Sequence, residues 1–189
     1  MGTDIDYAAA VIAISGKTSR GERIDTGGHA LAARLTNADR SEYLLTGKVI
    51  AVCVSEKKGE QKIPRDYITL VPEHGVESDA HAGKWHRQVS LLAKSSVDSL
   101  QAKVDISLTP GVFAENILVD GLDLKTLPIG TQLEIADALL EVTQIGKECH
   151  SDCVIRQKAG DCVMPREGIF ARVLIGGVVR SGDAVEVVG

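Results

Sequence analysis

The chain has 189 residues, of which 44% are hydrophobic and 25% are charged, and its formal net charge is −5. This is the composition of an ordinary globular protein and argues against wholesale disorder. The negative charge and the lack of any long basic run argue against sequence-independent binding to nucleic acid.

The beginning of the sequence carries no sign of a targeting or membrane segment. Met1–Asp6 has no cationic region, and the apolar run Tyr7–Ile14 is too short to span a bilayer. We therefore expect a cytoplasmic protein that makes no contact with membranes. Four cysteines in such a protein are more often reduced thiols, metal ligands or catalytic groups than a disulfide framework.

Residues 1–44 differ in texture from the rest of the chain. Tyr7–Ile14 predicts a buried strand, the polar and glycine-rich stretch Thr18–Gly28 predicts a loop, and His29–Leu35 can begin a helix. No second strand of the same kind follows, and one βα unit cannot bury both faces of a sheet. We predict a short βα-like N-terminal extension over residues 1–44 and a main domain over residues 45–189.

The main domain reads as a mainly β structure. Its β-prone segments are short and bounded by glycine, proline or aspartate, which favours a β-barrel with a few short helices over an alternating α/β sheet. Pro64 predicts an edge strand or a strand start, and Ser95–Val104 predicts a helix capped by Ser95 or Ser96. The predicted strands are Gly47–Val54, Ile63–Leu70, Gln88–Leu92, Ile117–Val119, Gln132–Ile135, Ala138–Val142, Ile169–Ile175 and Val185–Val188.

Three of the four cysteines follow the predicted strand that starts at Ala138, in one loop-like region. Cys149 stands out because Lys147 and His150 lie close to it in sequence. A thiolate attacks sulfane sulfur or binds metal, and neighbouring cations favour that form. We predict Cys149 as the reactive residue, while a small buried hydrophobe after a strand is the structural alternative.

The other cysteines of this region permit a second interpretation. Cys149, His150, Cys153 and Cys162 are all suitable zinc ligands, although their spacing matches no standard zinc finger. Cys153 or Cys162 could instead form a disulfide with Cys149 on oxidation. The sequence leaves these alternatives open.

Polar residues earlier in the main domain are candidates for the same site. We expect Asp79, His81, Glu115 and Asn116 to lie near Cys149, where Asp79 and His81 could orient a bound ligand or a metal-bound oxygen. The alternative is structural: Asp79 would cap a turn and Asn116 would bind loop backbone.

Two arginines are candidates for contact with an anion. Arg172 lies in an otherwise apolar β-prone segment, so we expect it to be buried and to need an anionic partner. That partner could be a cofactor phosphate held by a bidentate guanidinium, or Glu115 or Asp183, and we favour the internal ion pair. Arg166 follows Met164 and Pro165 in a predicted loop and is the freer of the two.

Residues 46–188 resemble the MOSC domain, named for the C-terminal part of molybdenum cofactor sulfurases. The resemblance implies a mostly β, barrel-like fold and puts Cys149 at the family's cysteine position, thought to carry sulfur as a persulfide or to ligate molybdenum. Many members have proline before this cysteine where this chain has Glu148, an anion that would raise the thiol pKa. The segments that carry the resemblance, in order, are Gly75–His81, Arg87–Leu92, Gly111–Ile117, Gly121–Leu124, Leu127–Gly130, Ala138–Thr143, Cys149, Gly168–Val173 and Gly182–Asp183.

The resemblance also implies cofactors and partners. It implies a molybdenum or tungsten pterin cofactor, a family-level association with pyridoxal phosphate, and a cysteine desulfurase or a molybdoenzyme as partner. It makes the chain a candidate sulfur carrier or transferase. The alternative from the residues themselves is a non-catalytic metal- or oxyanion-binding module with a structural Cys/His cluster.

The N-terminal extension carries a resemblance of its own. Val11–Ser15 with Gly21–Gly27 is similar to the opening of the molybdopterin-binding adenylyltransferase domain. The rest of that domain, including its later nucleotide loop, is absent from this sequence. The extension is therefore expected to have no adenylyltransferase activity. The two resemblances nevertheless point to the same pathway, that of the molybdenum cofactor.

Overall fold

The computed structural model describes residues 45–148, 156 and 161–188. The strand and helix predicted within residues 1–44 lie outside the described residues, and so do Cys149, His150 and Cys153. The division of the chain into an extension and a main domain stays a prediction.

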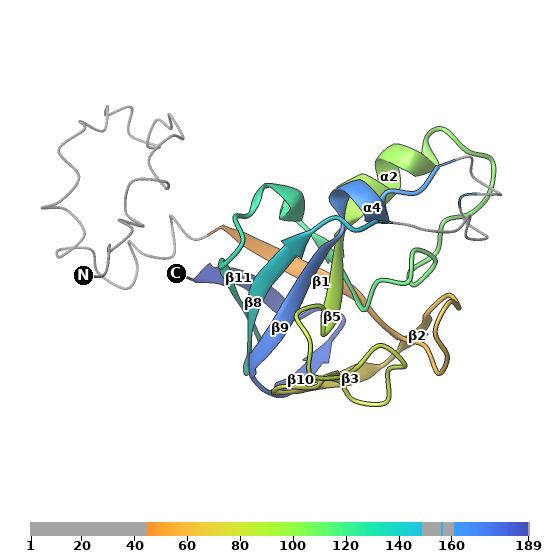
Figure 1. Cartoon of the computed structure of the whole chain (residues 1–189). Helices are drawn as coiled ribbons and strands as arrows, with labels where there is room; N and C mark the ends of the chain where they lie inside the picture. The colour runs from red at the N-terminus through yellow and green to blue at the C-terminus, as the bar shows by residue number, and fades with distance from the viewer. Residues whose placement is uncertain (1–44, 149–155, 157–160, 189) are drawn as a thin grey trace, which may run out of the picture. The chain divides into compact units, whose positions relative to one another are not determined.

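Within the described residues, seven strands close into a barrel, which confirms the predicted mainly β fold (Figure 1). Neighbours pair antiparallel except β5 and β6, which run parallel. Closure comes from the pairing of β1 with β11, so the ring leaves no open edge among these strands. Around the ring the strands are β1 (Thr46–Val54), β11 (Ala184–Val188), β7 (Gln132–Ile135), β8 (Ala138–Ile145), β9 (Ile169–Ile175), β5 (Val89–Ala93) and β6 (Ile117–Asp120).

Four further strands lie beside the barrel. β2 (Ile63–Arg65) pairs with the end of β1 and forms an edge of the sheet. It contains Pro64, which confirms the edge strand predicted for that proline. β3 (Tyr67–Val71) pairs with both β4 (Gly75–Val76) and β10 (Gly177–Arg180) in a small second sheet. The sequence analysis did not predict β4 and β10, which are only two and four residues long.

The helices gather at one end of the barrel (Figure 1). α2 (Lys94–Gln101) begins the crossover that the parallel pair β5 and β6 requires, and α4 (Met164–Glu167) and the 3₁₀ turn η2 (Leu124–Thr126) complete the set of described helices. The predicted helix is confirmed, but its serine cap is wrong: the N-cap is Ala93, with no side-chain cap bond. The Ser96 hydroxyl instead donates to Glu167 (2.8 Å).

Buried apolar side chains form two clusters. One fills the barrel and includes Val49, Leu91 and Leu140, and the other packs between the barrel wall and the helices and includes Leu92 and Phe170. β5 lies between them, so all five of its residues are buried. This double burial explains why β5 is apolar except for Ser90 and does not alternate between apolar and polar residues.

Candidate functional site

The centre of the site is a buried ion pair between Lys62 and Asp79. Lys62 immediately precedes β2 and Asp79 follows β4, and their side chains are 2% and 1% exposed. The Lys62 Nζ donates to Asp79 Oδ2 and lies 3.4 Å from the Ser55 hydroxyl. A buried charge is tolerated only with a partner of this kind, so the pair fixes both side chains.

Asp79 accepts several further hydrogen bonds. The Ser55 amide (3.1 Å) and the Asn116 side-chain amide (3.2 Å) donate to Oδ2, and the His81 amide donates to Oδ1 (2.9 Å). Burial alone would raise the pKa of Asp79, but hydrogen bonds from His81 and Lys62 outweigh it and hold the pKa well below its usual range. Asp79 is therefore a fixed carboxylate, and the bond from the His81 amide is the turn-capping role considered above.

Asn116 joins this carboxylate to the barrel. Its Oδ1 accepts hydrogen bonds from the amide (3.1 Å) and the hydroxyl (2.9 Å) of Ser90, and its Nδ2 also donates to the Cys53 carbonyl (3.1 Å). The residue thus links β5 and β1 with Asp79. Asn116 therefore binds backbone groups, as the structural alternative in the sequence analysis proposed, and it also contacts the ion pair.

Glu115 holds the loop next to Lys62. It is completely buried, and its carboxylate accepts bonds from the amides of Gly111 (2.5 Å) and Phe113 (3.1 Å). Burial raises its pKa to about 7, against the opposing effect of these amides. The Gly111 carbonyl in turn accepts the Lys62 amide (2.9 Å). Glu115 therefore supports the backbone beside Lys62 and lines neither of the pockets described next.

A pocket of about 130 Å³ is lined in part by Lys62 of the ion pair, and we call it the inner pocket. The Arg87 guanidinium carbon lies 4.7 Å from the ring centroid of Trp85 and 5.6 Å from that of Phe170. Arg87 Nε is buried and has no hydrogen-bond partner within the described part of the chain. The lining residues are Lys62, His81, Trp85, Arg87, Ser90, Ala114, Lys147, Met164 and Phe170.

The inner pocket is electropositive. Asp79 balances the charge of Lys62, but no acidic side chain in the described residues pairs with Arg87 or Lys147, and none lines the pocket. His81 Nδ1 lies 3.3 Å from Asp79 Oδ1 and 3.5 Å from Lys62 Nζ. The arrangement suits an anionic ligand or a thiolate.

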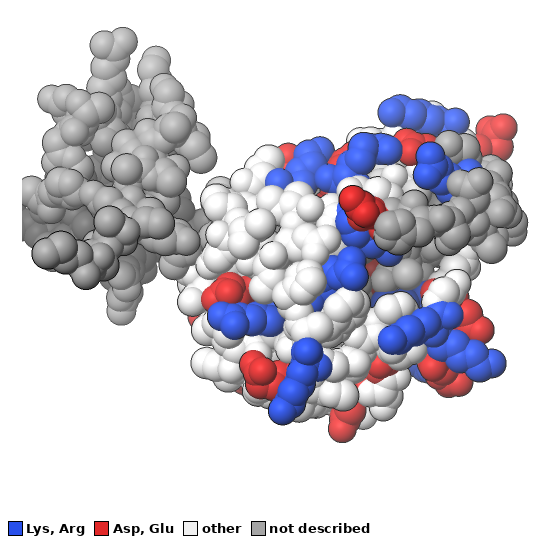
Figure 2. Space-filling view, in the orientation of Figure 1, with Lys and Arg blue, Asp and Glu red and all other residues white. Residues whose placement is uncertain are grey.

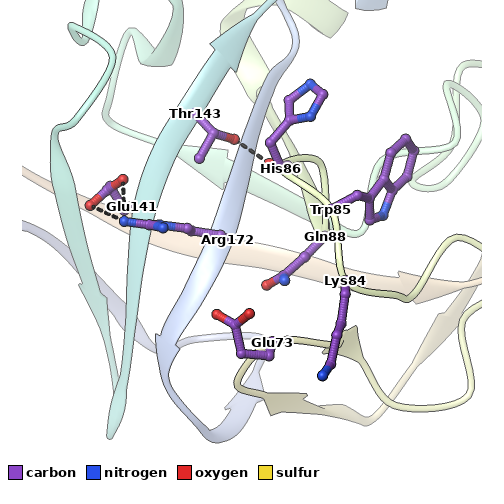
Figure 3. Close-up of a pocket in the computed structure, with 8 residues that line it drawn as sticks. All are labelled: Glu73, Lys84, Trp85, His86, Gln88, Glu141, Thr143 and Arg172. Carbon is purple, nitrogen blue, oxygen red and sulfur yellow. Dashed lines mark hydrogen bonds and ion pairs between the residues drawn. The ribbon is translucent and has the colours of Figure 1, made fainter.

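A second pocket of about 370 Å³, the outer pocket, shares Trp85 with the first (Figure 3). The Thr143 hydroxyl donates to the His86 carbonyl and ties this loop to β8. Basic and acidic side chains lie opposite each other here, in contrast to the inner pocket. The lining residues are Glu73, Lys84, Trp85, His86, Gln88, Glu141, Thr143 and Arg172.

Arg172 differs from its prediction. Its side chain is 46% exposed, and its guanidinium lies 3.1 Å from Glu141 Oε1 across the β8–β9 pair. The expected burial and the expected pairing with Glu115 or Asp183 are both wrong. The helix-covered part of β9 ends at Ala171, so the next outward-facing residue meets solvent.

Arg166 is also already paired. It lies in α4, and its guanidinium donates to both oxygens of Asp161 (2.9 and 2.7 Å) at the surface. This pair holds the pKa of Asp161 low, at about 2. Arg166 lines neither pocket, and its contact with an anion stays a prediction.

The cysteines that the structure describes are both buried. Cys162 packs in the core cluster beneath the helices. Burial raises the pKa of Cys53 to about 12, so this thiol stays protonated. Among the described residues no group of three His, Cys, Asp or Glu side chains is arranged to hold a metal. The zinc site of Cys149, His150, Cys153 and Cys162 stays a prediction, since three of its members lie outside those residues.

Asp79 accepts hydrogen bonds from the His81 amide and the Asn116 side chain, and the position of these three residues near Cys149 stays a prediction. The sequence analysis did not single out Lys62 and Arg87. Lys62 ends a charged stretch that reads as a solvated turn, and its burial follows only from the loop at Gly111. Arg87 had a weak signal, because it lies two residues after the single tryptophan and directly before a buried strand.

Comparisons with known proteins agree with this architecture. The family model of the MOSC domain matches residues 78–186. The YuaD protein from Bacillus subtilis is similar in structure, with a TM-score of 0.65 and 20% identity over 76% of this chain and 96% of that chain. YiiM from Geobacillus stearothermophilus has a TM-score of 0.59 and 18% identity over 76% and 75% of the two chains.

YiiM from Escherichia coli is also similar, with a TM-score of 0.54 and 18% identity over 77% of this chain and 69% of that chain. Likenesses at this identity concern the fold. A search of curated protein sequences gave no match. No helix in the described residues is long and apolar enough to cross a membrane. Because the family model matches more than half of the 189 residues, the chain belongs to the MOSC domain family.

Proposed function

We propose that this protein carries sulfur for the molybdenum cofactor, as a persulfide on Cys149 beside the inner pocket. The family relates the chain to molybdenum cofactor biology. The observation that supports the finer role is the position of Lys147 in the pocket wall. Cys149 is two residues further along the chain, and covalent geometry limits the distance between the two Cα atoms to about 7.6 Å.

The charge of the pocket favours a reactive thiol. A nearby cation stabilises a thiolate and lowers the pKa of its thiol. Lys147 and Arg87 have no acidic partner within the described residues. Glu148 acts in the opposite direction, but it is exposed, and water and salt weaken its effect. The balance favours the thiolate.

The size of the pocket favours a small group. Its volume of about 130 Å³ corresponds to about four water molecules, whereas sites that enclose a cofactor-sized ligand measure about 300–1,000 Å³. A sulfur atom on a cysteine fits this space, and an entire pterin cofactor does not.

The transfer itself needs a sulfur donor. The Cys149 thiolate would attack the outer sulfur of a cysteine desulfurase persulfide. A new S–S bond forms at Cys149 while the donor's S–S bond breaks, and the donor cysteine leaves as a thiolate without net oxidation. We assign the pyridoxal phosphate chemistry associated with the family to that donor enzyme.

Mass measurement tests the carrier role. The protein is incubated with a desulfurase and cysteine, and the intact mass is measured without reductant. We expect one added sulfur atom on the wild-type protein and on Cys153→Ala, and none on Cys149→Ala. Lys147→Gln should raise the pKa of the loaded thiol. An absence of added sulfur on the wild type, or equal addition to Cys149→Ala, would remove this function.

A second candidate function is supported by the outer pocket. Its volume of about 370 Å³ is within the range of ligand sites, and it shares Trp85 with the inner pocket. In this reading the protein holds a molybdenum or tungsten pterin cofactor, with Cys149 as a metal ligand. Arg87 and Lys147 fit the phosphate better than Arg166 and Arg172, which are paired with carboxylates.

Elemental analysis of freshly purified protein separates these functions. Molybdenum or tungsten together with pterin fluorescence would favour the cofactor holder. Stoichiometric zinc that is released only on unfolding would favour the structural cluster of Cys149, His150, Cys153 and Cys162.

A further inference from the structure

We propose that Arg87, together with Lys147 and His81, forms a receptor for a tetrahedral oxyanion in the inner pocket. The ligand class is a sulfate-like dianion, supplied either as a free inorganic ion or as the phosphate group of a larger molecule. The proposal rests on the proposed function only in using the same pocket, and it requires neither Cys149 nor a covalent step.

The first support is the state of Arg87. Its guanidinium lies over the rings of Trp85 and Phe170, which restrict the plane of the group. The buried Nε–H has no acceptor within the described residues, and an unsatisfied buried donor costs about 1–3 kcal/mol. An oxyanion would supply acceptors to this planar fork, which matches tetrahedral oxygens in a bidentate manner.

The second support is the charge that surrounds the space. The Lys62 charge is balanced by Asp79, so the net positive charge of the pocket comes from Arg87 and Lys147. The outer pocket is lined by two basic side chains, Lys84 and Arg172, and also by the carboxylates of Glu73 and Glu141. An anion is therefore favoured in the inner pocket and not in the outer one.

The third support is size and polarity. A space of about 130 Å³ holds about four waters, which is comparable to the four oxygens of one tetrahedral ion. His81 is one-third exposed, with its Nδ1 against Asp79. Its ring adds a polar group to the pocket wall.

The experiment uses the full-length Cys149→Ala protein, which cannot carry sulfur on residue 149. Sodium sulfate and phenyl phosphate are titrated by calorimetry at low, constant ionic strength, with sodium chloride as the blank. We expect saturable binding of at least one of the two. Arg87→Met keeps an apolar side chain between the rings and should weaken that binding at least tenfold.

Arg180→Met is the matched control. Arg180 also lies over an aromatic ring, 5.5 Å from the centroid of Tyr67, but it lines neither pocket, so its loss should leave the affinity unchanged. Thermal unfolding of each variant shows that it is folded at the temperature of titration. Arg87→Lys is the second variant, because it keeps the charge but lacks the fork and should recover only part of the affinity.

Each outcome decides the proposal. Tighter binding of phenyl phosphate identifies a phosphate group of a larger ligand as the source, and equal or tighter binding of sulfate identifies a free ion. Saturable binding of neither probe, or equal affinity in folded Arg87→Met, overturns the receptor. Uptake of sulfur by wild-type Cys149 without oxyanion binding would overturn this inference alone and leave the proposed function intact.

Discussion

The inner and outer pockets share Trp85 but hold their charges in different ways. In the outer pocket Arg172 and Glu141 form an ion pair on the solvent side of β8 and β9 (Figure 3). In the inner pocket the Lys62–Asp79 pair is buried, and backbone and side-chain donors surround its carboxylate. Figure 2 shows that exposed basic and acidic side chains are intermixed over the visible face. The buried Lys62–Asp79 pair is therefore held in place by its surroundings, whereas the exposed Arg172–Glu141 pair is not. Four predictions test this difference between buried and exposed groups.

The largest effect is expected from Asp79→Ala. It leaves the buried Lys62 ammonium and three amide donors without their acceptor, and breaking a buried pair in this way costs about 3–5 kcal/mol. Urea unfolding measures the loss of free energy of unfolding. Glu141→Ala, the matched change in the outer pocket, should cost less than about 1 kcal/mol.

Adding Lys62→Met to Asp79→Ala should restore part of the stability, because it removes the uncompensated charge. Equal losses for Asp79→Ala and Glu141→Ala would contradict the contrast between the two pockets.

The next effect concerns the pH dependence of stability. The pKa of Glu115 is raised from 4.5 to about 7 in the folded protein, so the folded state binds a proton more tightly than the unfolded chain. This contribution is fully present below pH 4.5 and is lost as pH rises through 7, by about 3 kcal/mol in total. Unfolding free energies of wild type and Glu115→Gln, measured from about pH 4 to about pH 8, isolate it.

Glu115→Gln should lack this part of the fall in stability, whereas Glu141→Gln on the exposed face should retain it. A wild-type slope preserved in Glu115→Gln would show that another group is responsible.

A third prediction compares two glycines with nearly equal backbone angles. Gly111 has φ +87° and Gly59 has φ +84°, but a Cβ at Gly111 would lie 2.1 Å from the Lys62 carbonyl oxygen, while nothing lies within 4 Å at Gly59. Gly59→Ala should cost about 1–2 kcal/mol for its left-handed backbone. Gly111→Ala should cost a further 1–3 kcal/mol or so for the overlap. Matching losses in thermal unfolding would deny the close approach of this loop to Lys62.

The smallest effect is expected from Arg172→Gln. The pair with Glu141 is exposed on the arginine side, and such pairs contribute less than about 1 kcal/mol. The difference from wild type in melting temperature should shrink further at high salt, because salt screens exposed charges. A large loss that salt does not change would place Arg172 in a more buried role than its 46% exposure indicates.

Much of the barrel could be predicted from sequence because its strands are locally marked. β7 and β8 are β-prone runs separated only by Ala136 and Asp137, and Ile135 pairs with Ala138 across this two-residue connection. Two features could not be predicted from local pattern. Ile169–Ala171 is covered on both faces whereas Arg172 is not, and the boundary depends on where α4 sits.

The candidate site was predictable only in part. Asp79 and His81 were proposed because they lie in a glycine-flanked loop, and Asn116 because it lies in a segment that resembles the family. Lys62 was not, since nothing in its own neighbourhood distinguishes it from the solvated lysines at positions 57 and 58. Its burial arises from the contact with the Gly111 loop, about fifty residues later in the chain.

The pairing of β1 with β11 has a consequence for synthesis of the protein. Thr46 lies opposite Glu186, so the ring joins segments separated by nearly the entire domain. Contacts of such long sequence separation slow folding, and β1 and β7 keep open edges until β11 has left the ribosome. During that interval the nascent chain exposes two strands that can pair with other chains, so the risk of aggregation is greatest before β11 has joined the ring.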